Sequence, residues 1–300
     1  MQKGPSSGAE EAESQGDKRE YSPKIEDQAS GLQEYFSRYD GAIISYSGGV
    51  DSALLAYVAH LALGERMLAV IADSPSLSRR EWRSAKEFAS RFDIPLRTVY
   101  TEELKDPDYI SNMGNRCYYC KKDLFKKLHE LRDQLTGPAD NRIVWPIICG
   151  TNLDDLNDYR PGMRAAEEAS VLAPYVDLGF DKKTIRALAS YFDIGIADKP
   201  AMPCLASRIA YGEEVTDQRL RQVEEGEDLL YELGLKIFRV RHHGALARIE
   251  VPPHDFPVLI ENGEHIVKKF RELGFTFVGM DLAGFKSGSL NETLTRQQAI

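Results

Sequence analysis

The alternation of apolar and polar residues over the first two thirds of the chain predicts strands that alternate with helices. Short apolar runs typical of buried strands occupy residues 42–46, 67–72, 95–100 and 143–149. Helical spacing of apolar residues fills the gaps between the first three runs, at residues 51–63 and 79–92. This order indicates βαβ units, so we expect an α/β domain with a parallel sheet covered by helices on both faces.

The last third of the chain has a different pattern, which predicts a smaller α+β module. A charged helix, two β-like runs, one long helix and a last strand follow each other at residues 216–233, 236–241, 246–251, 256–273 and 275–280. The two β-like runs flank His242-His243-Gly244-Ala245 and suggest an antiparallel hairpin. We therefore expect the sheet domain at residues 29–211 and the module at residues 212–290.

The two ends of the chain are expected to lie outside these domains. Residues 1–28 contain almost no large apolar residues, so they cannot bury enough surface to offset the entropy cost of ordering. We expect a disordered tail there and a second tail at residues 291–300. The length of 300 residues agrees with two domains at roughly 150 residues each.

The junction between the first strand and the first helix carries the strongest chemical signal. Its sequence is Ser47-Gly48-Gly49-Val50-Asp51-Ser52. Two glycines allow a tight turn that brings backbone N–H groups against phosphate oxygens, and the helix N-terminus adds a positive dipole end. The loop lacks the lysine of a GxxxxGK[ST] motif, so kinase-like transfer of a γ-phosphate is not implied. The alternative is an ordinary strand–turn–helix corner, which the surrounding serines and aspartate disfavour.

Composition narrows the class of protein. Lysine plus arginine number 38 and aspartate plus glutamate 47, a net charge of −9 that disfavours a protein whose main task is to grip nucleic acid. No apolar run approaches the ~18 residues of a membrane span, and the N-terminus has no apolar signal region. Four cysteines are too few for a disulfide framework in a chain of this length. We expect a cytoplasmic protein without a nucleic-acid or membrane partner.

Three cysteines lie in segments that favour chemistry over packing. Cys117 and Cys120 form a Cys-x-x-Cys pair, and Cys204 lies in the irregular stretch Met202-Pro203-Cys204-Leu205-Ala206-Ser207-Arg208. A thiolate is well suited to attack an activated acyl group, and the neighbouring Arg208 is a cation that favours the thiolate. Cys149 lies within an apolar run and is expected to be a buried core thiol.

The loop resembles the pyrophosphate loop of the ATP pyrophosphatase (PP-loop) superfamily, with its adenine nucleotide alpha hydrolase-like fold. Together with Asn115–Lys122, Gly150–Gly162 and Met202–Arg208, it is similar to the LarE family of ATP-dependent sacrificial sulfur transferases, over residues 30 to 285. This resemblance implies that ATP is cleaved between its α and β phosphates, with Mg²⁺ holding pyrophosphate. It also implies that the carboxylates of pyridinium-3,5-biscarboxylic acid mononucleotide are adenylylated and converted to thiocarboxylates, for the nickel-pincer nucleotide of lactate racemase.

The resemblance also assigns roles to individual residues. The residues expected to line the ATP site are Ser45, Ser47, Gly48, Gly49, Asp51, Ser52, Asp73 and Ser74. Candidate Mg²⁺ ligands are Asp51 and Asp155. Cys204 is the expected sulfur-bearing nucleophile, and Lys121 is expected near the reacting centre, although by itself it would be a surface lysine.

Four arginines are candidates for binding the anionic substrate. Arg241 and Arg248 alternate on the two predicted hairpin strands, so cross-strand pairing would create a small cationic patch suited to a phosphate. Arg160 and Arg208 lie in two of the three family-like stretches, Gly150–Gly162 and Met202–Arg208. The alternative for the hairpin arginines is an ordinary surface ladder.

The origin of the sulfur stays open at this point. Cys117, Cys120 and Cys204 could hold a [4Fe-4S] cluster that carries an extra sulfide, Cys204 could be sacrificed directly, or the thiols could bind zinc or be inert. Two other functions compete, a PP-loop tRNA-thiolating enzyme and a non-catalytic nucleotide-binding protein. The resemblance further implies a homo-oligomer, with a hexamer as the suggested form.

Overall fold

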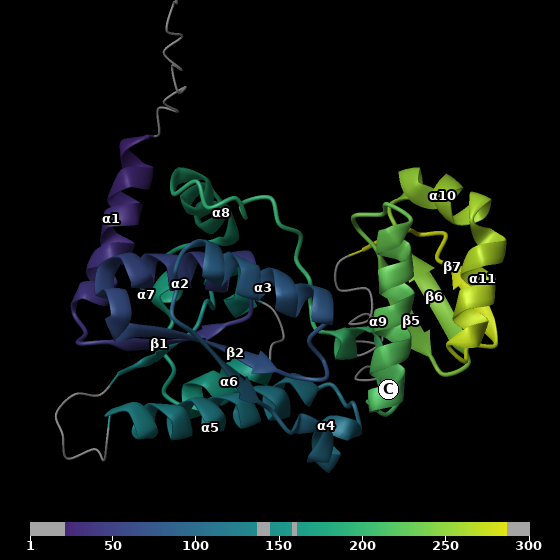
Figure 1. Ribbon diagram of the computed structural model, residues 1–300, viewed down its shortest axis with the longest axis horizontal. Helices are drawn as coiled ribbons and strands as arrows, with labels where there is room; N and C mark the ends of the chain where they lie inside the picture. Colours follow the sequence, from purple (N-terminus) through teal and green to yellow (C-terminus); the bar gives the residue numbers. More distant parts are fainter. Residues whose placement is uncertain (1–21, 137–144, 158–160, 287–300) are drawn as a thin grey trace, which may run out of the picture.

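The computed structural model describes residues 22–136, 145–157 and 161–286. Figure 1 shows two bodies side by side, a larger one built on a sheet and a smaller one that begins with the long helix α9 (Asp217–Glu232). The carboxyl ends of the strands in the larger body point toward the smaller one. Ligands of open α/β sheets bind at this edge, so the fold places the expected site between the two bodies.

The larger body contains a sheet of four parallel strands in the order β3-β2-β1-β4. The strands are β1 (Ala42–Tyr46), β2 (Met67–Asp73), β3 (Leu96–Tyr100) and β4 (Ile147–Ile148). In the register, Ala42 lies beside Met67 and Ile43 beside Ile147. The predicted parallel sheet is therefore confirmed, although the fourth strand is shorter than expected and residues 143 and 144 lie outside the described part.

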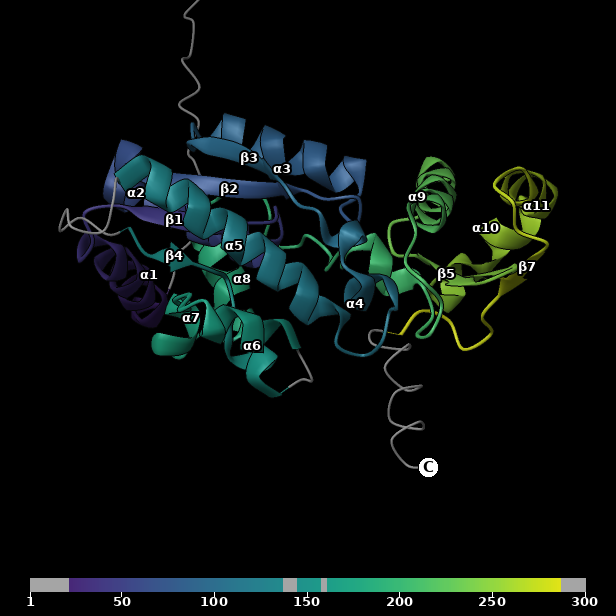
Figure 2. The same ribbon diagram turned by 90° about the horizontal axis from the view of Figure 1, so that it is seen from below.

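Helices cover both faces of this sheet, as the apolar runs predict. Helices α1 (Pro23–Ser37), α2 (Val50–Leu63), α3 (Arg79–Arg91) and α8 (Lys182–Tyr191) pack on one face, while α5 (Arg116–Thr136) and α6 (Pro161–Glu168) cover the other (Figure 2). Successive strand residues alternate between the faces, so Ile44 joins the first cluster and Ile43 the second. Both are fully buried, and such burial contributes roughly 1.5–3 kcal/mol per side chain.

Helix α1 corrects the predicted N-terminal tail. The helix begins at Pro23, and Ile25 and Ala29 are buried against the sheet domain. Proline suits the first turn of a helix because its missing N–H has no intrahelical partner there. The predicted tail over residues 1–28 is thus wrong for residues 23–28, whose short amphipathic pattern is only evident together with Leu32 and Phe36 further along.

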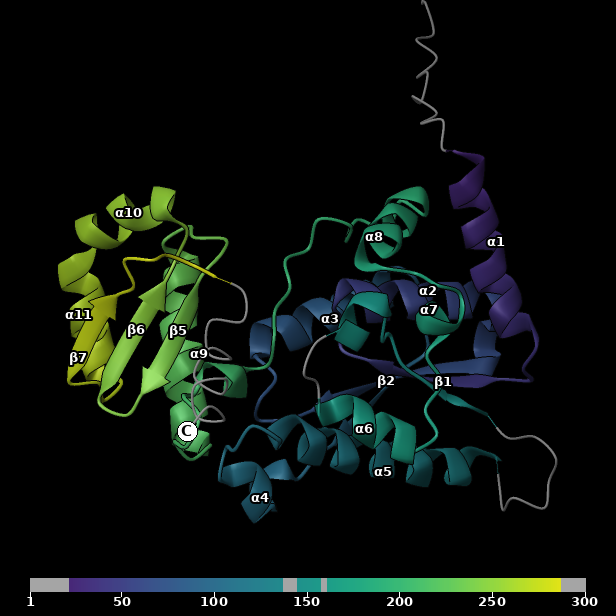
Figure 3. The ribbon, with the colours of Figure 1, turned by 180° about the vertical axis from the view of Figure 1, so that it is seen from behind.

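The smaller body is the predicted α+β module. Its strands β5 (Arg239–His243), β6 (Leu246–Glu250) and β7 (Phe277–Met280) form a sheet in that order, with β5 and β6 antiparallel and β6 and β7 parallel (Figure 3). The expected hairpin is confirmed. The single helix expected over residues 256–273 is wrong. Two helices, α10 (Phe256–Glu261) and α11 (Gly263–Glu272), are separated at Asn262. Asn and Gly are both poor helix-interior residues, which accounts for the break.

Short helical turns occupy stretches without clear sequence periodicity. They include α4 (Pro107–Ile110), α7 (Pro174–Asp177), and the 3₁₀ turns η1 (Gly64–Arg66), η2 (Glu103–Lys105), η3 (Leu153–Asn157), η4 (Leu205–Arg208) and η5 (Pro253–Asp255). Helix α5 begins at Arg116, so both Cys117 and Cys120 are helical. In the part of the chain that the structure describes, no helix combines the length and apolarity that a membrane span requires.

The two bodies are joined by contacts around the loop that follows β2. The backbone N–H of Arg79 donates to the Glu224 carboxylate at 2.5 Å, and Arg80 forms an ion pair with Asp228 at 2.8 Å. The N–H of Leu205 donates to the Ser76 carbonyl at 2.7 Å. The loop after β2 therefore fixes both α9 and the turn η4, which directly follows Cys204.

Candidate active site

The phosphate loop holds its own shape through serine hydroxyls. The Ser52 hydroxyl accepts from the Ser47 backbone N–H at 3.1 Å, lies 3.0 Å from the Ser47 hydroxyl and donates to the Gly49 carbonyl at 3.2 Å. Gly49 is the N-cap of α2 and supplies no side-chain cap. The first N–H groups of α2 are thus left for another acceptor, which is the arrangement that binds phosphate at a helix N-terminus.

Two glycines explain how closely this loop is packed. Gly48 has a φ of +74°, and a methyl group at this position would overlap the side chain of Ala85 on α3. Gly150 approaches the start of α2 so closely that a Cβ would lie 3.1 Å from the Asp51 backbone. The loop is therefore held between α3 and the Gly150 turn: only glycine fits at position 48, and at position 150 a larger residue would require its neighbours to shift.

Asp51 lies at the centre of a small polar network. Its side chain pairs with Lys182, and its carbonyl accepts from the Tyr175 hydroxyl at 2.9 Å. Its second carboxylate oxygen, Oδ1, is buried and has no partner among the described residues. A buried carboxylate oxygen of this kind fits a hard cation such as Mg²⁺.

Asp155, the second predicted Mg²⁺ ligand, is engaged in a local turn. Its carboxylate accepts from the Asn152 backbone N–H at 3.2 Å. The neighbouring Asp154 accepts from the backbone N–H of Lys182 at 2.8 Å and so positions the lysine that reaches Asp51. Within residues 22–136, 145–157 and 161–286, no three His, Cys, Asp or Glu side chains are gathered as a metal site. Asp51 is thus the predicted Mg²⁺ ligand that the geometry supports.

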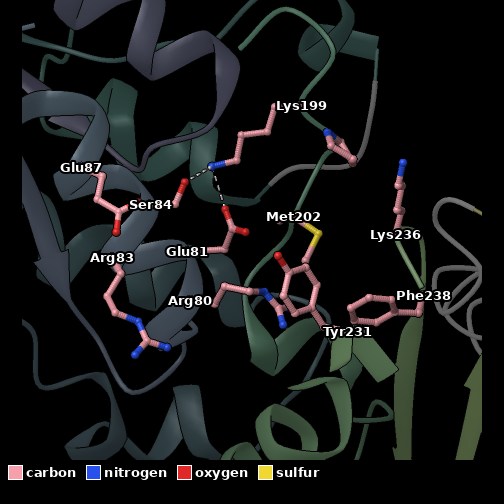
Figure 4. A pocket seen from close by; sticks show the side chains of 11 residues that line it. Arg80, Glu81, Arg83, Ser84, Glu87, Lys199, Met202, Tyr231, Lys236 and Phe238 are labelled. Carbon is pink, nitrogen blue, oxygen red and sulfur yellow. Dashed lines mark hydrogen bonds and ion pairs between the residues drawn. The ribbon is translucent and has the colours of Figure 1, made fainter. Parts of the chain in front are cut away.

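Two lysines at the phosphate loop were not among the site residues predicted from the sequence. Lys182 pairs with Asp51, and the Lys199 ammonium donates to the Gly48 carbonyl at 3.0 Å and pairs with Glu81 at 2.9 Å (Figure 4). Lys182 occupies the first turn of α8, where a cation opposes the helix dipole. This unfavourable position of Lys182 was a signal in the sequence that the lysine has a role at the site. For Lys199 the sequence offers no such signal.

Asp73 and Ser74, expected to contact the nucleoside, lie at the carboxyl end of β2 but already have partners. Asp73 pairs with Arg79 at 2.5 Å, and Arg79 also donates to the Ser74 carbonyl at 3.0 Å. The Ser74 hydroxyl donates to the buried Glu103 and accepts from the Ser76 N–H at 3.0 Å. These contacts shape the loop after β2. Ser45 lies on β1, is buried, and leads directly into the phosphate loop.

Cys204 is exposed, and its main chain is held firmly. The turn after it is anchored by the hydrogen bond from Leu205 to Ser76, and its carbonyl accepts from Arg208 at 3.0 Å. The Arg208 guanidinium pairs in turn with Glu227 on α9, at 2.9 Å and 3.1 Å. An exposed sulfur on an anchored backbone is suited to a nucleophile that must meet a bound electrophile.

The described arginines that were predicted to bind substrate form ion pairs with carboxylates of the protein. Arg208 is buried against Glu227 and donates to the Cys204 carbonyl, so its guanidinium is already engaged by groups of the protein. The register does place Arg241 opposite Arg248, as expected, but the buried Glu250 pairs with both, and Arg248 also pairs with Asp281. The predicted cationic patch is therefore neutralised. Arg160 lies outside the described residues.

The three candidate thiols are neighbours. Cys117 and Cys120 lie on the first turns of α5, and charge on Cys204 affects both. Loss of surrounding water and the nearby Cys204 raise the pKa of Cys117, while Arg116 and Lys121 oppose this shift. Burial and the Glu103 carboxylate raise the pKa of Cys120 well above its usual range.

Lys121 lies on α5 close to Cys117 and Cys120, and its expected place near the reacting centre stays a prediction. The positive charge of Lys121 partly offsets the rise in the pKa of Cys117 and Cys120. The backbone at Gly162 packs closely against the Lys121 side chain. Cys149 is buried with its sulfur 3.2 Å from the Thr151 hydroxyl, which confirms the expected core thiol. Among the described residues, no three His, Cys, Asp or Glu side chains are gathered as a metal site, so the structure gives no support to the iron–sulfur set or the zinc alternative, and both stay predictions.

Comparison with known proteins agrees with this geometry. The sequence model of the NAD synthase family matches residues 25–115, which include the phosphate loop. Pyridinium-3,5-bisthiocarboxylic acid mononucleotide synthase of Lactiplantibacillus plantarum is 31% identical over 256 residues, which cover 85% of this chain and 90% of that protein. The chain belongs to the LarE family of PP-loop proteins.

Two further relatives show how widely the LarE-like sequence occurs. An uncharacterized protein of the cyanobacterium Synechocystis sp. is 40% identical over 275 residues, which cover 91% of this chain and 100% of that protein. An uncharacterized protein of Methanocaldococcus jannaschii is 31% identical over 245 residues, with 82% of this chain and 90% of that protein covered. Membership in the LarE family makes this protein an ATP-utilising enzyme of the PP-loop type.

Proposed function

We propose that this enzyme adenylylates the carboxylates of pyridinium-3,5-biscarboxylic acid mononucleotide and replaces a carboxylate oxygen by the sulfur of Cys204. The observation that carries the proposal is the placement of Cys204. Its sulfur is exposed, while Arg208 and the bond from Leu205 to Ser76 fix its backbone beside the loop that follows β2. The similarity to the Lactiplantibacillus synthase supports the substrate.

The first step is activation of the acid by ATP. The uncapped N–H groups of α2 bind phosphate oxygens, and Lys182 and Lys199 add positive charge next to them. Mg²⁺ bound through Asp51 would neutralise the pyrophosphate leaving group. A substrate carboxylate oxygen attacks the α-phosphorus, the bond to the β-phosphate oxygen breaks, and pyrophosphate leaves.

The second step moves sulfur without an external donor. The Cys204 thiolate attacks the carbonyl carbon of the acyl adenylate, AMP leaves, and a thioester forms. Removal of the α-proton of Cys204 then breaks its Cβ–S bond. The thiocarboxylate leaves with the electron pair, and dehydroalanine remains in the chain. One ATP and one cysteine sulfur are consumed for each carboxylate converted.

Intact-protein mass after turnover tests the proposal. With ATP, Mg²⁺ and the biscarboxylic acid mononucleotide, the mass is expected to fall by that of one H₂S, and tandem mass spectrometry should place the loss at residue 204. A Cys204→Ser variant should keep its mass, and Cys149→Ser, at the core thiol, should lose mass as the parent does. An unchanged mass together with product and protein-bound iron would show that sulfur comes from another source.

Pyrophosphate release separates this proposal from two other functions. Stimulation by the pyridinium mononucleotide supports it, whereas stimulation by tRNA instead would indicate a tRNA-thiolating enzyme. Absence of any ATP-dependent pyrophosphate release would indicate a nucleotide-binding protein without turnover.

A further inference from the structure

A cavity of about 410 Å³ lies where the two bodies of the molecule meet. Helix α3, the segment 199–202, the end of α9 and the residues that lead into β5 all contribute to its wall. Figure 4 shows Met202 and Tyr231 in the middle of the view, Lys199 and Lys236 above them, and Phe238 beside Tyr231 at the right. Junctions between domains are common positions for small-molecule sites.

The cavity adjoins both halves of the proposed chemistry. One of its lining residues, Lys199, donates to the Gly48 carbonyl in the phosphate loop. Another, Met202, precedes Cys204 by two residues in the chain. A molecule in this cavity would therefore contact the loop that binds ATP through Lys199 and the sulfur-bearing segment through Met202.

The charges that line the cavity favour an anion. Four cations, Arg80, Arg83, Lys199 and Lys236, face two carboxylates, Glu81 and Glu87. Lys199 is paired with Glu81 and Arg80 with Asp228. Arg83 and Lys236 are exposed and form no direct ion pair within the described residues, although the charge of Arg83 also acts on Asp228. Their charges are available to a ligand.

An aromatic ring supplies the apolar part of the site. Tyr231 is 57% exposed, which is unusual for a side chain of its size in a recess, and the Arg80 guanidinium lies 4.6 Å from its ring centre. Phe238 lies next to Tyr231, with its ring centre 5.6 Å from the Arg80 guanidinium, and is buried (Figure 4). A flat ring could pack against Tyr231, and a positively charged ring would gain a cation–π contact.

The acceptor of the proposed reaction combines these properties. It has a pyridinium ring, two carboxylates and a phosphate, yet the arginines of the β5–β6 hairpin are neutralised by Glu250 and Asp281. We propose that this junction cavity is the docking site of the acceptor mononucleotide, with the pyridinium ring on Tyr231 and the anionic groups at Arg83 and Lys236. This inference rests on the proposed function.

Calorimetric titration with pyridinium-3,5-biscarboxylic acid mononucleotide tests the assignment. We expect Tyr231→Leu and Lys236→Gln each to weaken binding of the mononucleotide about tenfold, which corresponds to roughly 1.4 kcal/mol. Both side chains are exposed, so folding should be unaffected, and circular dichroism checks this. ATP affinity should stay unchanged. Matched controls are Tyr100→Leu on β3 and Lys268→Gln on α11, both exposed and remote from the cavity.

The outcomes separate the two proposals. If the parent protein binds the mononucleotide and both cavity variants bind it equally well, the docking site is wrong while the proposed function stands. If the parent does not bind it and releases no pyrophosphate in its presence, the proposed function fails and the docking site with it. Weakening in the cavity variants alone, with the controls unchanged, supports the assignment.

Discussion

Replacing Glu227 by glutamine should destabilise the protein strongly, although the side chain barely changes in size. The Arg208–Glu227 pair is almost completely buried, with 1% and 2% of the two side chains exposed. Glu227 receives two hydrogen bonds from Arg208, at 2.9 Å and 3.1 Å, and one from the Val240 N–H at 3.1 Å. Glutamine keeps the volume but removes the negative charge, which leaves the Arg208 cation buried without a counterion.

The expected loss follows from the burial of the pair. Breaking a buried ion pair by removing one partner costs about 3–5 kcal/mol, a large share of the roughly 5–15 kcal/mol that stabilises a typical native protein. Equilibrium unfolding in urea measures this loss as a lower midpoint, by about 1–2.5 M for a slope of roughly 2–3 kcal/mol per molar.

A matched control lies in the first turn of the same helix. Arg221 and Asp217 also form an ion pair, but 71% and 53% of their side chains are exposed. Asp217→Asn should therefore cost no more than about 1 kcal/mol. If Glu227→Gln lowered the midpoint no further than Asp217→Asn does, the argument that Arg208 depends on this counterion would be refuted.

Three further predictions concern the phosphate loop and the module. Gly48→Ala should abolish ATP binding, measured by calorimetry, because position 48 has a φ of +74° and a methyl there would collide with α3. Lys182→Gln should weaken ATP binding by about tenfold or less, or roughly 1 kcal/mol, because an ammonium beside the phosphates is lost and Asp51 loses its partner. Burial lowers the pKa of His242 from 6.5 to about 4, so unfolding should take up a proton in this range, and stability should fall as the pH drops from 6.5 to 4.

The controls for these predictions use neighbouring or equivalent positions. Gly64→Ala also changes a glycine with positive φ, but no atom lies near its Cβ, so ATP binding should survive. Lys183→Gln, next to Lys182, should leave ATP affinity unchanged. A His242→Gln variant should lose less stability between pH 6.5 and pH 4 than the parent does, whereas the exposed His265→Gln should behave like the parent. An equal loss in all three proteins would assign the pH effect to other groups.

Local patterns in the sequence predicted the framework of this fold well. Ile43 and Ile44 face opposite sides of the sheet because strand residues alternate, so a fully apolar run could only be a strand buried on both faces. The turn at Gly48-Gly49 could also be predicted from the sequence, because its conformation depends only on residues that are adjacent in the chain. The break at Asn262 was missed although a Gly follows it, because the apolar spacing continues on both sides.

The electrostatic part of the site could not be predicted in this way. Arg241 and Arg248 do lie opposite each other, but the sequence could not show that Glu250 is buried between them and pairs with both. Arg208 likewise finds its partner Glu227 only through the docking of α9. The partner of a charged side chain is decided by the tertiary structure. The residues next to it in the sequence do not indicate which group that partner will be.

If Cys204 gives up its sulfur as proposed, the way in which its backbone is held has a consequence for the spent protein. Arg208 holds the carbonyl of this residue, and Ser76 holds the amide of the next one, so neither anchor uses the side chain. A molecule that has given up this atom should keep its shape and its melting temperature. Spent and fresh copies would then differ by one functional group, and quality control that detects unfolding would not distinguish them.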